Sequence, residues 1–221
     1  MPDSPSIETR LLEAALPHVA FDGWSEATLA AAARDSEIDI ALARAVFPRG
    51  GLDMALAYHR SGDRAMLAGY AARDLSNMRY RDKVTALVRL RVELADKEAV
   101  QRGAALLALP QNALAGAGAM WGTADAIWTA LGDTSRDGNW YSKRAILSAV
   151  LSSTVLYWLG DDSADHAETW AFLDRRIEDV MRFETAKAQA RKSPLLAGPL
   201  ALFERLRAPE ACDGLPGRVR G

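Results

Sequence analysis

The chain has 221 residues, of which 49% are hydrophobic and 25% are charged, a composition typical of a soluble globular protein with one good core. Its net charge of −2 gives no overall attraction to nucleic acids or acidic membranes, so any such attraction must be local. Cys212 is the only cysteine, which excludes a disulfide framework and a metal-thiolate cluster and fits a reducing compartment.

The first ten residues, MPDSPSIETR, contain neither a basic segment followed by an apolar run nor an amphipathic segment rich in arginine and serine. Such segments mark signal and transit peptides, so we expect none here. This beginning is typical of a bacterial cytoplasmic protein or of a chain that has already been processed.

Three helices are predicted at the N-terminal end. Ser6 is expected to cap a helix over residues 7–19, in which Pro17 should cause a kink or an early stop. Further helices are predicted over 26–34 and 40–47. Two helices, a short turn and a third helix ending in Phe-Pro form a helix-turn-helix layout, similar to the N-terminal portion of TetR-type regulators.

The charge of this module argues against DNA binding. Residues 25–53 contain three basic side chains against five acidic ones, whereas duplex binding commonly uses about six to ten Lys or Arg contacts with phosphate. The segment IALARAVF also offers alanines and a single arginine where side chains would read bases. The layout is interpreted as a scaffold, and a TetR-type ligand-responsive regulator with a degenerate DNA-reading helix remains the alternative function.

The middle of the chain is predicted to consist of further helices. Residues 52–78 form either one long helix or two shorter helices broken near Ser61 and Gly62. Two more helices are predicted over 82–95 and 98–109, the second of them stopped by a proline.

Polar residues of this region give no functional signal. Arg81, Arg89 and Arg91 are expected to form a solvated face. His59 is isolated, because no second histidine or carboxylate is placed with it for a metal site. We therefore expect no metal here.

A glycine-containing helix is predicted over residues 111–131. Its glycines do not fit a nucleotide-binding loop, because the spacing is G-x-G-x-x-x-G and no strand precedes it. Gly118 and Gly122 lie one helical turn apart and would let something approach closely. That neighbour is either another helix or an elongated apolar ligand in a groove between helices.

Residues 125–163 contain three of the six tryptophans beside a short acidic turn. Residues 132–135, Gly-Asp-Thr-Ser, are predicted to stop one helix, and Asp137 or Asn139 to cap the next. From 145 to 159 the only polar residues are small hydroxylic ones apart from a tyrosine, so this helix is predicted to be the central buried helix. It is too short for a membrane span, which needs roughly 20 apolar residues.

Trp140 and Tyr141 at the start of that helix have two interpretations. They either pack down as a hydrophobic plug over the helix end or, with Asp137 and the edge formed by Ile127 and Trp128, form an exposed aromatic patch. Patches of that kind anchor protein interfaces.

The C-terminal part begins with a turn and cap predicted at residues 161–163, followed by one long helix predicted over 164–192. A basic stretch then leads into SPLLAGPLALFERLRAP, which would lie in a membrane interface or pack back on its own domain or a second subunit. Residues 208–221 are expected to be disordered. The apolar residues of the membrane segment are Leu195, Leu196, Leu202, Phe203 and Leu206.

Catalytic motifs are sparse. We find no H-E-x-x-H, no G-x-S-x-G, no phosphate-binding Walker loop and no Glu-x-x-His pairs of a di-iron bundle. We therefore expect a protein that is not an enzyme and that needs no cofactor.

A long ungapped pattern resembles the signature of the coenzyme Q biosynthesis protein nine (Coq-nine) family. It reads D-x-x-W-x-x-x-G-D-x-S-x-D-x-N-W-Y-[ST]-[KR]-R-x-x-L from Asp125 to Leu147. The resemblance extends to the TetR-like beginning, to Leu109-Pro110-x-Asn112 and to Trp170-x-Phe172-Leu173-x-x-Arg176. Gly138 departs from the bulkier residue that the family commonly has before the asparagine, which should loosen the turn.

This resemblance implies an all-α, TetR-like fold that dimerises, holds isoprenoid lipids or ubiquinone precursors, and associates with membranes through a C-terminal amphipathic helix. It also implies a non-catalytic role beside the di-iron hydroxylase that acts on demethoxyubiquinone, in the cytoplasm at the inner membrane. The expected division is 1–52 helix-turn-helix-like module, 53–192 lipid-binding domain, 193–207 amphipathic segment and 208–221 tail. By position, the partner-facing residues are Asp125, Ile127, Asp137, Trp140 and Tyr141, and the lipid-facing residues are Gly118, Trp121, Gly122, Leu151 and Val155.

Overall fold

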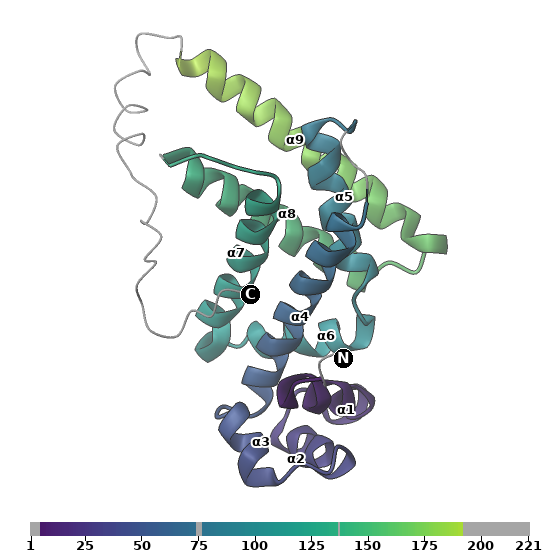
Figure 1. Ribbon diagram of the computed structural model, residues 1–221. Coiled ribbons are helices and arrows are strands. Elements are labelled where there is room, and N and C mark those ends of the chain that lie inside the picture. Colours follow the sequence, from purple (N-terminus) through teal and green to yellow (C-terminus); the bar gives the residue numbers. More distant parts are fainter. Residues whose placement is uncertain (1–4, 74–76, 137, 192–221) are drawn as a thin grey trace.

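A computed structural model describes residues 5–73, 77–136 and 138–191, with side chains up to residue 182. The described residues form α-helices and short 3-10 turns and contain no strand, so the predicted all-α class is confirmed. The three N-terminal helices form one end of the molecule, and the remaining helices form a bundle above them (Figure 1).

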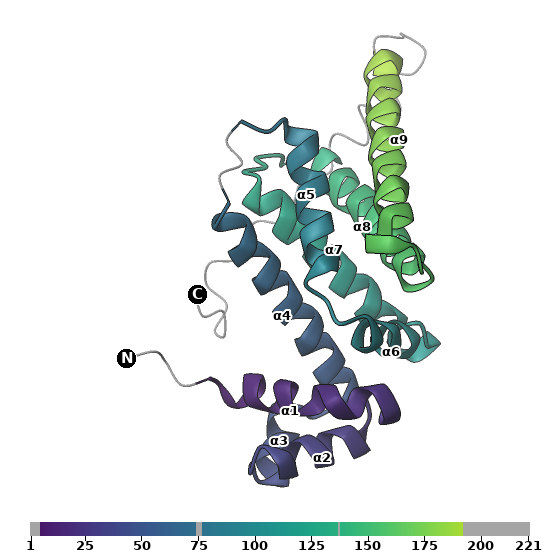
Figure 2. The same ribbon diagram turned by 90° about the vertical axis from the view of Figure 1, so that its right-hand side faces the viewer.

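The N-terminal module consists of α1 (Ile7–Asp22), α2 (Glu26–Asp35) and α3 (Ile40–Val46). Each helix begins at a side-chain cap: Ser6 for α1, Ser25 for α2 and Asp39 for α3. The side chains of Leu11, Leu29 and Phe47 are fully buried and form its core together with residues of α4 and α6. Figure 2 shows α1 lying across the lower end of α4.

Pro17 does not end α1, so the predicted early stop is wrong. The helix continues for five residues to Asp22. Proline removes one backbone hydrogen bond, and here both Pro17 and Glu13, whose carbonyl loses its partner, are exposed. Water can satisfy that carbonyl, so the break that a buried proline would cause is avoided.

α4 (Gly51–Ala71) is a single helix of 21 residues with no break at Ser61 and Gly62. A Cβ on Gly62 would lie 2.7–2.9 Å from the guanidinium of Arg91 on α5 (Tyr80–Glu93). The glycine is therefore required by the close approach of α5, and the alternative of two shorter helices is wrong.

The upper bundle contains α4, α5, α6 (Lys97–Leu107), α7 (Ala113–Ala130), α8 (Gly138–Leu159) and α9 (Ala167–Arg191), with short 3-10 turns η1 (Pro110–Asn112) and η2 (Ala164–His166). α7 packs on α4 and α8, and α9 on α5 and α8. A second hydrophobic cluster fills the space between these helices. Its most buried members are Met66, Leu87, Val88, Ala124, Ile127 and Leu173.

α8 is not buried on every side, which corrects the prediction of a central buried helix. Leu147, Leu151 and Trp158 face the interior, but Leu156 is 66% exposed. The other helices of the chain therefore leave some apolar side chains of α8 exposed.

The two hydrophobic clusters are joined at α4 and α6. Tyr58 on α4 packs against Trp24 of the N-terminal module with ring centroids 5.3 Å apart. The indole N–H of Trp24 donates to the carbonyl of Ala99 on α6 at 2.9 Å, and the backbone N–H of Asp96 donates to the Tyr58 hydroxyl at 3.0 Å. Trp24 thus fixes the N-terminal module to the bundle by a hydrogen bond as well as by packing.

Candidate functional site

The end of α7, the turn after it and the first turns of α8 form what we call the α7–α8 corner (residues 125–136 and 138–144). Gly132 ends α7 with a φ of +74°, and its N–H donates to the carbonyl of Thr129 at 3.0 Å. A residue in the left-handed region is the common end of a helix, and glycine adopts it without strain. The predicted stop at this turn is confirmed.

A buried arginine is the centre of the α7–α8 corner. Arg144 is 3% exposed; its Nε donates to Asp125 at 2.6 Å, and its Nη1 donates to Asp133 and to the Trp140 carbonyl at 3.3 and 3.2 Å. Lys143 donates to the other oxygen of Asp133 at 2.6 Å. Because a buried unpaired charge is strongly destabilising, these acceptors hold the corner in one geometry.

The surroundings of Asp133 stabilise the ionised form of its carboxyl group. Burial by itself would raise its pKa, but hydrogen bonds from Lys143 and Ser135 and the nearby lysine charge outweigh burial and lower the pKa below the ordinary value. Asp133 therefore stays ionised well below neutral pH and keeps both cations in place.

Three aromatic rings pack beside this ion-pair network and form the aromatic cluster. Trp121 lies 5.8 Å from Trp140 and 6.4 Å from Tyr141, and the last two meet edge to face at 4.8 Å. The guanidinium of Arg144 lies 4.1 Å from the centroid of Trp140. All three rings are half-buried, so they combine features of the plug and of the exposed patch.

The predicted partner-facing residues are only partly brought together. Asp125, with a side chain 45% exposed, Trp140 and Tyr141 all reach the surface of the corner. Ile127 is fully buried in the second hydrophobic cluster, so its assignment to an exposed patch is wrong. It lies on the face of α7 that packs inward. Asp137 lies outside the described residues.

The predicted lipid-facing residues separate into two groups. Gly118 and Gly122 are exposed, and nothing in the described chain lies within 4 Å of a Cβ built on either. Leu151 and Val155 instead line an internal cavity, while Trp121 belongs to the aromatic cluster. The prediction that both glycines line a groove between helices with these residues is wrong for the single chain, because α7 turns them outward.

The internal cavity has a polar end that sequence reasoning missed. It holds about 50 Å³ between α4, α5, α6, α7 and α8. At this end, His59 and Asp63 of α4, Arg91 of α5 and Thr123 of α7 form the polar cluster. Arg91 is only 9% exposed, which corrects its assignment to a solvated face. The one available signal was the spacing of His59 and Asp63, four residues apart on one helix.

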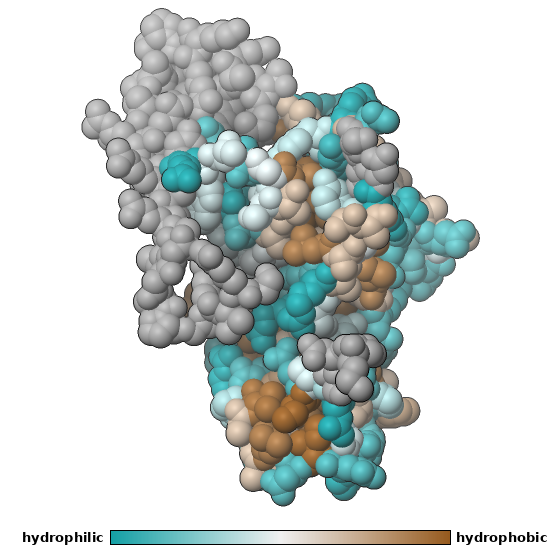
Figure 3. Space-filling view, in the orientation of Figure 1, coloured by the Kyte–Doolittle hydropathy of each residue, from teal (hydrophilic) through white to brown (hydrophobic). Residues whose placement is uncertain are grey.

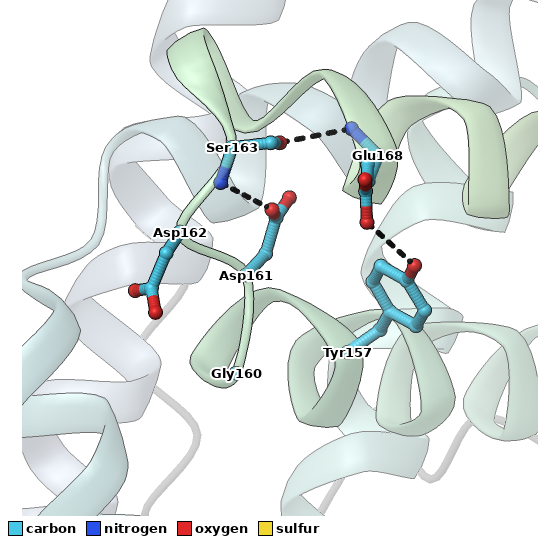
Figure 4. A pocket seen from close by; sticks show the side chains of 6 residues that line it. All are labelled: Tyr157, Gly160, Asp161, Asp162, Ser163 and Glu168. Carbon is cyan, nitrogen blue, oxygen red and sulfur yellow. Dashed lines mark hydrogen bonds between the residues drawn. The ribbon is translucent and has the colours of Figure 1, made fainter.

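A larger and more open pocket lies at the junction of α8 and α9, with a volume of about 550 Å³ (Figure 4). Its carboxylates Asp161, Asp162 and Glu168 suggest a cation site at first. However, Asp161 already accepts hydrogen bonds from Ser163 and Thr169, which hold its pKa well below the ordinary value. Its role is to cap the turn into α9, as predicted, and the described residues contain no group of side chains suited to a metal ion.

The surface of the N-terminal module does not resemble a DNA-binding face. Arg44 of α3 pairs with Glu26 at 2.7 Å, and Arg49 pairs with Asp53 at 2.6 Å, so both cations are compensated. Leu42 on α3 is 44% exposed. A hydrophobic patch lies at this end of the molecule, where Figure 1 places α1 and α3 (Figure 3).

The predicted membrane segment cannot be placed. Its residues Leu195, Leu196, Leu202, Phe203 and Leu206 lie outside the described part of the chain. Within the described part, no helix combines the length and the apolar character that crossing a bilayer requires.

Residues 113–184, which include the α7–α8 corner, match the model of the COQ9 family. The mitochondrial ubiquinone biosynthesis protein COQ9 of Rattus norvegicus is 32% identical over 193 residues, which cover 82% of this chain and 61% of the rat protein. The Homo sapiens protein of the same name is 30% identical over 193 residues, with coverages of 82% and 60%. The chain thus spans about 60% of the length of these relatives.

The fold is similar to that of a solved regulator. The crystal structure of the TetR transcriptional regulator from Nitrosomonas europaea aligns with a TM-score of 0.63 and 15% identity, over 79% of this chain and 97% of the other. At this identity the likeness concerns the fold alone, and the predicted TetR-like architecture is confirmed. With the family match and the relatives above, it follows that the chain belongs to the COQ9 family.

Proposed function

We propose that this chain is a non-catalytic, lipid-binding accessory protein of ubiquinone biosynthesis. In this role it binds isoprenoid or quinone precursors and presents them, as a homodimer at the membrane, to the hydroxylase that acts on demethoxyubiquinone. The observation that carries the proposal is the α7–α8 corner, which lies inside the segment that matches the COQ9 family. The relatives are named as mitochondrial ubiquinone biosynthesis proteins.

The physical need for such a protein follows from the chemistry of prenyl lipids. Each methylene exposed to water costs about 0.8 kcal/mol, so a soluble enzyme cannot easily draw a long-tailed precursor out of a bilayer. A helical protein with an apolar interior and a membrane-associated segment over residues 193–207 would shelter the tail during transfer. The peripheral location at the inner membrane is part of the same proposal.

The α7–α8 corner is suited to contact a protein partner. Trp140 and Tyr141 are half-exposed on a rigid ion-paired base, and the carboxylate of Asp125 lies partly exposed beside them. Large aromatic rings held in one conformation lose little entropy on binding and dominate many interfaces. We assign the hydroxylase contact to these three residues.

Substituting Trp140 tests this contact. Trp140→Lys should abolish copurification with the hydroxylase, while the melting temperature changes little because the ring is only half-buried. Phe21→Lys, at an 86% exposed ring outside the corner, serves as the control and should bind normally. If Trp140→Lys instead collapses thermal stability, the ring belongs to the core and the docking assignment fails.

Lipid content and DNA binding separate the proposal from a regulator. Organic extraction of the purified protein should yield prenyl lipid, and the protein should not retard DNA at physiological salt. The ion pairs of Arg44 and Arg49 support the second expectation, since both cations are already neutralised. Retarded DNA with no extracted lipid would favour the regulator.

The membrane segment has its own test. Removing residues 193–221 should lower liposome binding while the protein remains dimeric. Unchanged liposome association would eliminate the assignment of Leu195, Leu196, Leu202, Phe203 and Leu206 to membrane contact.

A further inference from the structure

The internal cavity has two chemically different sides. Hydrophobic side chains form most of its wall, and His59, Arg91 and Thr123 form one polar end. A cavity of this kind suits a molecule with an apolar body and one compact polar group. The apolar wall consists of Val92, Ala95, Val100, Met120, Leu151, Val155 and Trp158.

Hydrogen bonding within the polar cluster fixes the state of the histidine. The Thr123 hydroxyl donates to Asp63 at 2.9 Å, because a carboxylate can only accept. The lone pair of Thr123 is then left to accept from Nε2–H of His59 at 2.8 Å. Nδ1 of His59 lies 3.3 Å from Nη2 of Arg91, and because a guanidinium can only donate, Nδ1 accepts this hydrogen bond and carries no proton. Burial, which lowers the pKa of His59, agrees with this neutral ring.

The charges of the polar cluster cancel. Nε of Arg91 donates to Asp63 at 2.7 Å, so one cation and one anion form a pair whose side chains are only 11% and 15% exposed. With a neutral His59, the net charge at this end of the cavity is zero. A carboxylate or phosphate that entered would be desolvated beside a cluster whose own charges sum to zero.

One donor group of the polar cluster remains available. Nε and Nη2 of Arg91 are taken by Asp63 and by His59, whose carbonyl accepts from Nη2 at 3.0 Å. No residue in the described part of the chain accepts a hydrogen bond from Nη1 of Arg91. An arginine nitrogen is a strong donor, so an oxygen acceptor with no formal charge completes its hydrogen bonding without adding charge.

We infer that this end of the cavity is a head-group subsite that selects neutral oxygen acceptors, such as quinone carbonyls or phenolic oxygens, over carboxylate and phosphate heads. The inference rests on the proposed lipid-binding function and deepens it. Arg91 donates to the ligand oxygen, while Asp63, His59 and Thr123 position Arg91.

The size of the cavity sets how the ligand enters. About 50 Å³ admits the oxygen-bearing edge of a ring. A cavity of about 150 Å³ accommodates a whole benzene ring. Met120 is the lining side chain with the most rotatable bonds, and its unbranched thioether adapts readily to a new shape. We expect full occupation to change the rotamer of Met120.

A ligand series on the unmodified full chain tests the inference without any substitution. Titration calorimetry at neutral pH would compare a decyl-substituted benzoquinone, decanoate and decylbenzene. The quinone should bind at least about tenfold more tightly than decanoate, because only the anion adds an uncompensated charge. Equal or tighter binding of decanoate overturns the subsite but leaves lipid binding intact. If none of the three ligands binds, the proposed function fails with it.

A double variant locates the selectivity. Arg91→Met with Asp63→Leu removes both charges together, because removing one would leave the other buried and unpaired. Quinone affinity should fall about tenfold while decylbenzene affinity stays within about twofold, since one hydrogen bond to a charged donor is lost. The matched control is Arg102→Met with Glu98→Leu, an exposed ion pair on α6. Unchanged quinone preference in the first variant overturns the assignment; if that variant does not fold, the ligand series decides alone.

Discussion

Two buried arginines organise the interior of this protein, and each is held by acceptors from different helices. Arg144 joins α7 to α8 through Asp125 and Asp133, and Arg91 joins α4 to α5 through Asp63. Neither partnership is visible in local sequence patterns. At the residue scale, the chain therefore depends on a few long-range ion pairs as well as on its hydrophobic clusters.

The first prediction concerns acid stability. The folded pKa of Asp133 lies below its unfolded value, which is about 3.9, so its stabilising contribution is complete above about pH 5 and is lost as pH falls through the folded pKa. Asp133→Asn should cost about 1–3 kcal/mol at pH 7. Urea unfolding should show this difference shrinking between about pH 5 and 3.

The exposed Asp162 provides the control for that series. Asp162→Asn should change the free energy of unfolding only slightly, and this change should not shrink between about pH 5 and 3 in the way expected for Asp133→Asn. If the difference between Asp133→Asn and the unmodified protein did not change with pH, ionisation of Asp133 would not contribute to stability.

The second prediction uses two helical glycines with opposite surroundings. Gly62→Ala should destabilise the fold by about 1–3 kcal/mol, because the new methyl group displaces a guanidinium that Asp63 and His59 hold in place. Gly118→Ala should stabilise by about 0.5–1 kcal/mol, since its Cβ meets open space and alanine favours a helix. Denaturant unfolding measures both; equal effects would contradict the close approach at Gly62.

Sequence reasoning at this scale succeeded where the signal was local. The turn at Gly132 and the cap at Asp161 were predictable because their partners lie within a few residues. Arg91 was not predictable, because its partners come from α4, far away in the sequence, and a helix pattern with several arginines resembles a solvated face. Ile127 was misplaced for a similar reason, because its neighbours in sequence are surface residues of the corner.

At the scale of elements, helix existence could be read from the sequence better than helix ends. Ser6 caps α1 as expected, and α2 and α3 begin at the predicted residues, after the caps Ser25 and Asp39. Continuity was harder to predict, because Pro17 and Gly62 break helices in some environments and not in others. What decides is whether water or a neighbouring helix accommodates the residue, and the sequence pattern does not contain that information.

The third prediction concerns the short helix α3. The Asp39 carboxylate accepts hydrogen bonds from the N–H groups of Ala41 and Leu42 at 2.8 and 3.4 Å. Asp39→Ala should cost about 1 kcal/mol and speed hydrogen exchange of α3, because a helix of seven residues has few other stabilising bonds. Asp39→Asn, whose side chain can still cap, should restore most of the loss; equal behaviour of the two variants would contradict the capping role.

At the scale of the whole molecule, the outer side of α7 and α8 is more apolar than a solvated surface requires. Leu114 is 90% exposed and Leu156 66% exposed. Two contacts show how α7 and α8 run antiparallel: Asp125 pairs with Arg144, and the Ser148 hydroxyl donates to the Met120 carbonyl at 3.4 Å. Continuing this register places Leu114 on α7 opposite the helical turn of α8 that contains Leu156. This face is where we place contact between two copies of the chain.

The fourth prediction tests that contact. The unmodified protein should form a dimer, and Leu156→Glu should shift the mass measured by light scattering to one chain of 23.9 kDa, because a buried carboxylate in the interface is strongly unfavourable. Phe21→Glu, at an exposed apolar residue of α1, should remain dimeric. A monomeric unmodified protein, or a dimeric Leu156→Glu variant, would place the interface elsewhere or remove it.

The single long α4 has a consequence for how the molecule comes apart. Tyr58 touches Trp24 of the N-terminal module, while the adjacent His59 belongs to the polar cluster of the bundle. The first half of α4 belongs to the first hydrophobic cluster and its second half to the second, so unfolding of this one helix disrupts both clusters together. On heating, the chain should therefore lose all its helices in one cooperative step in scanning calorimetry, without a surviving N-terminal intermediate.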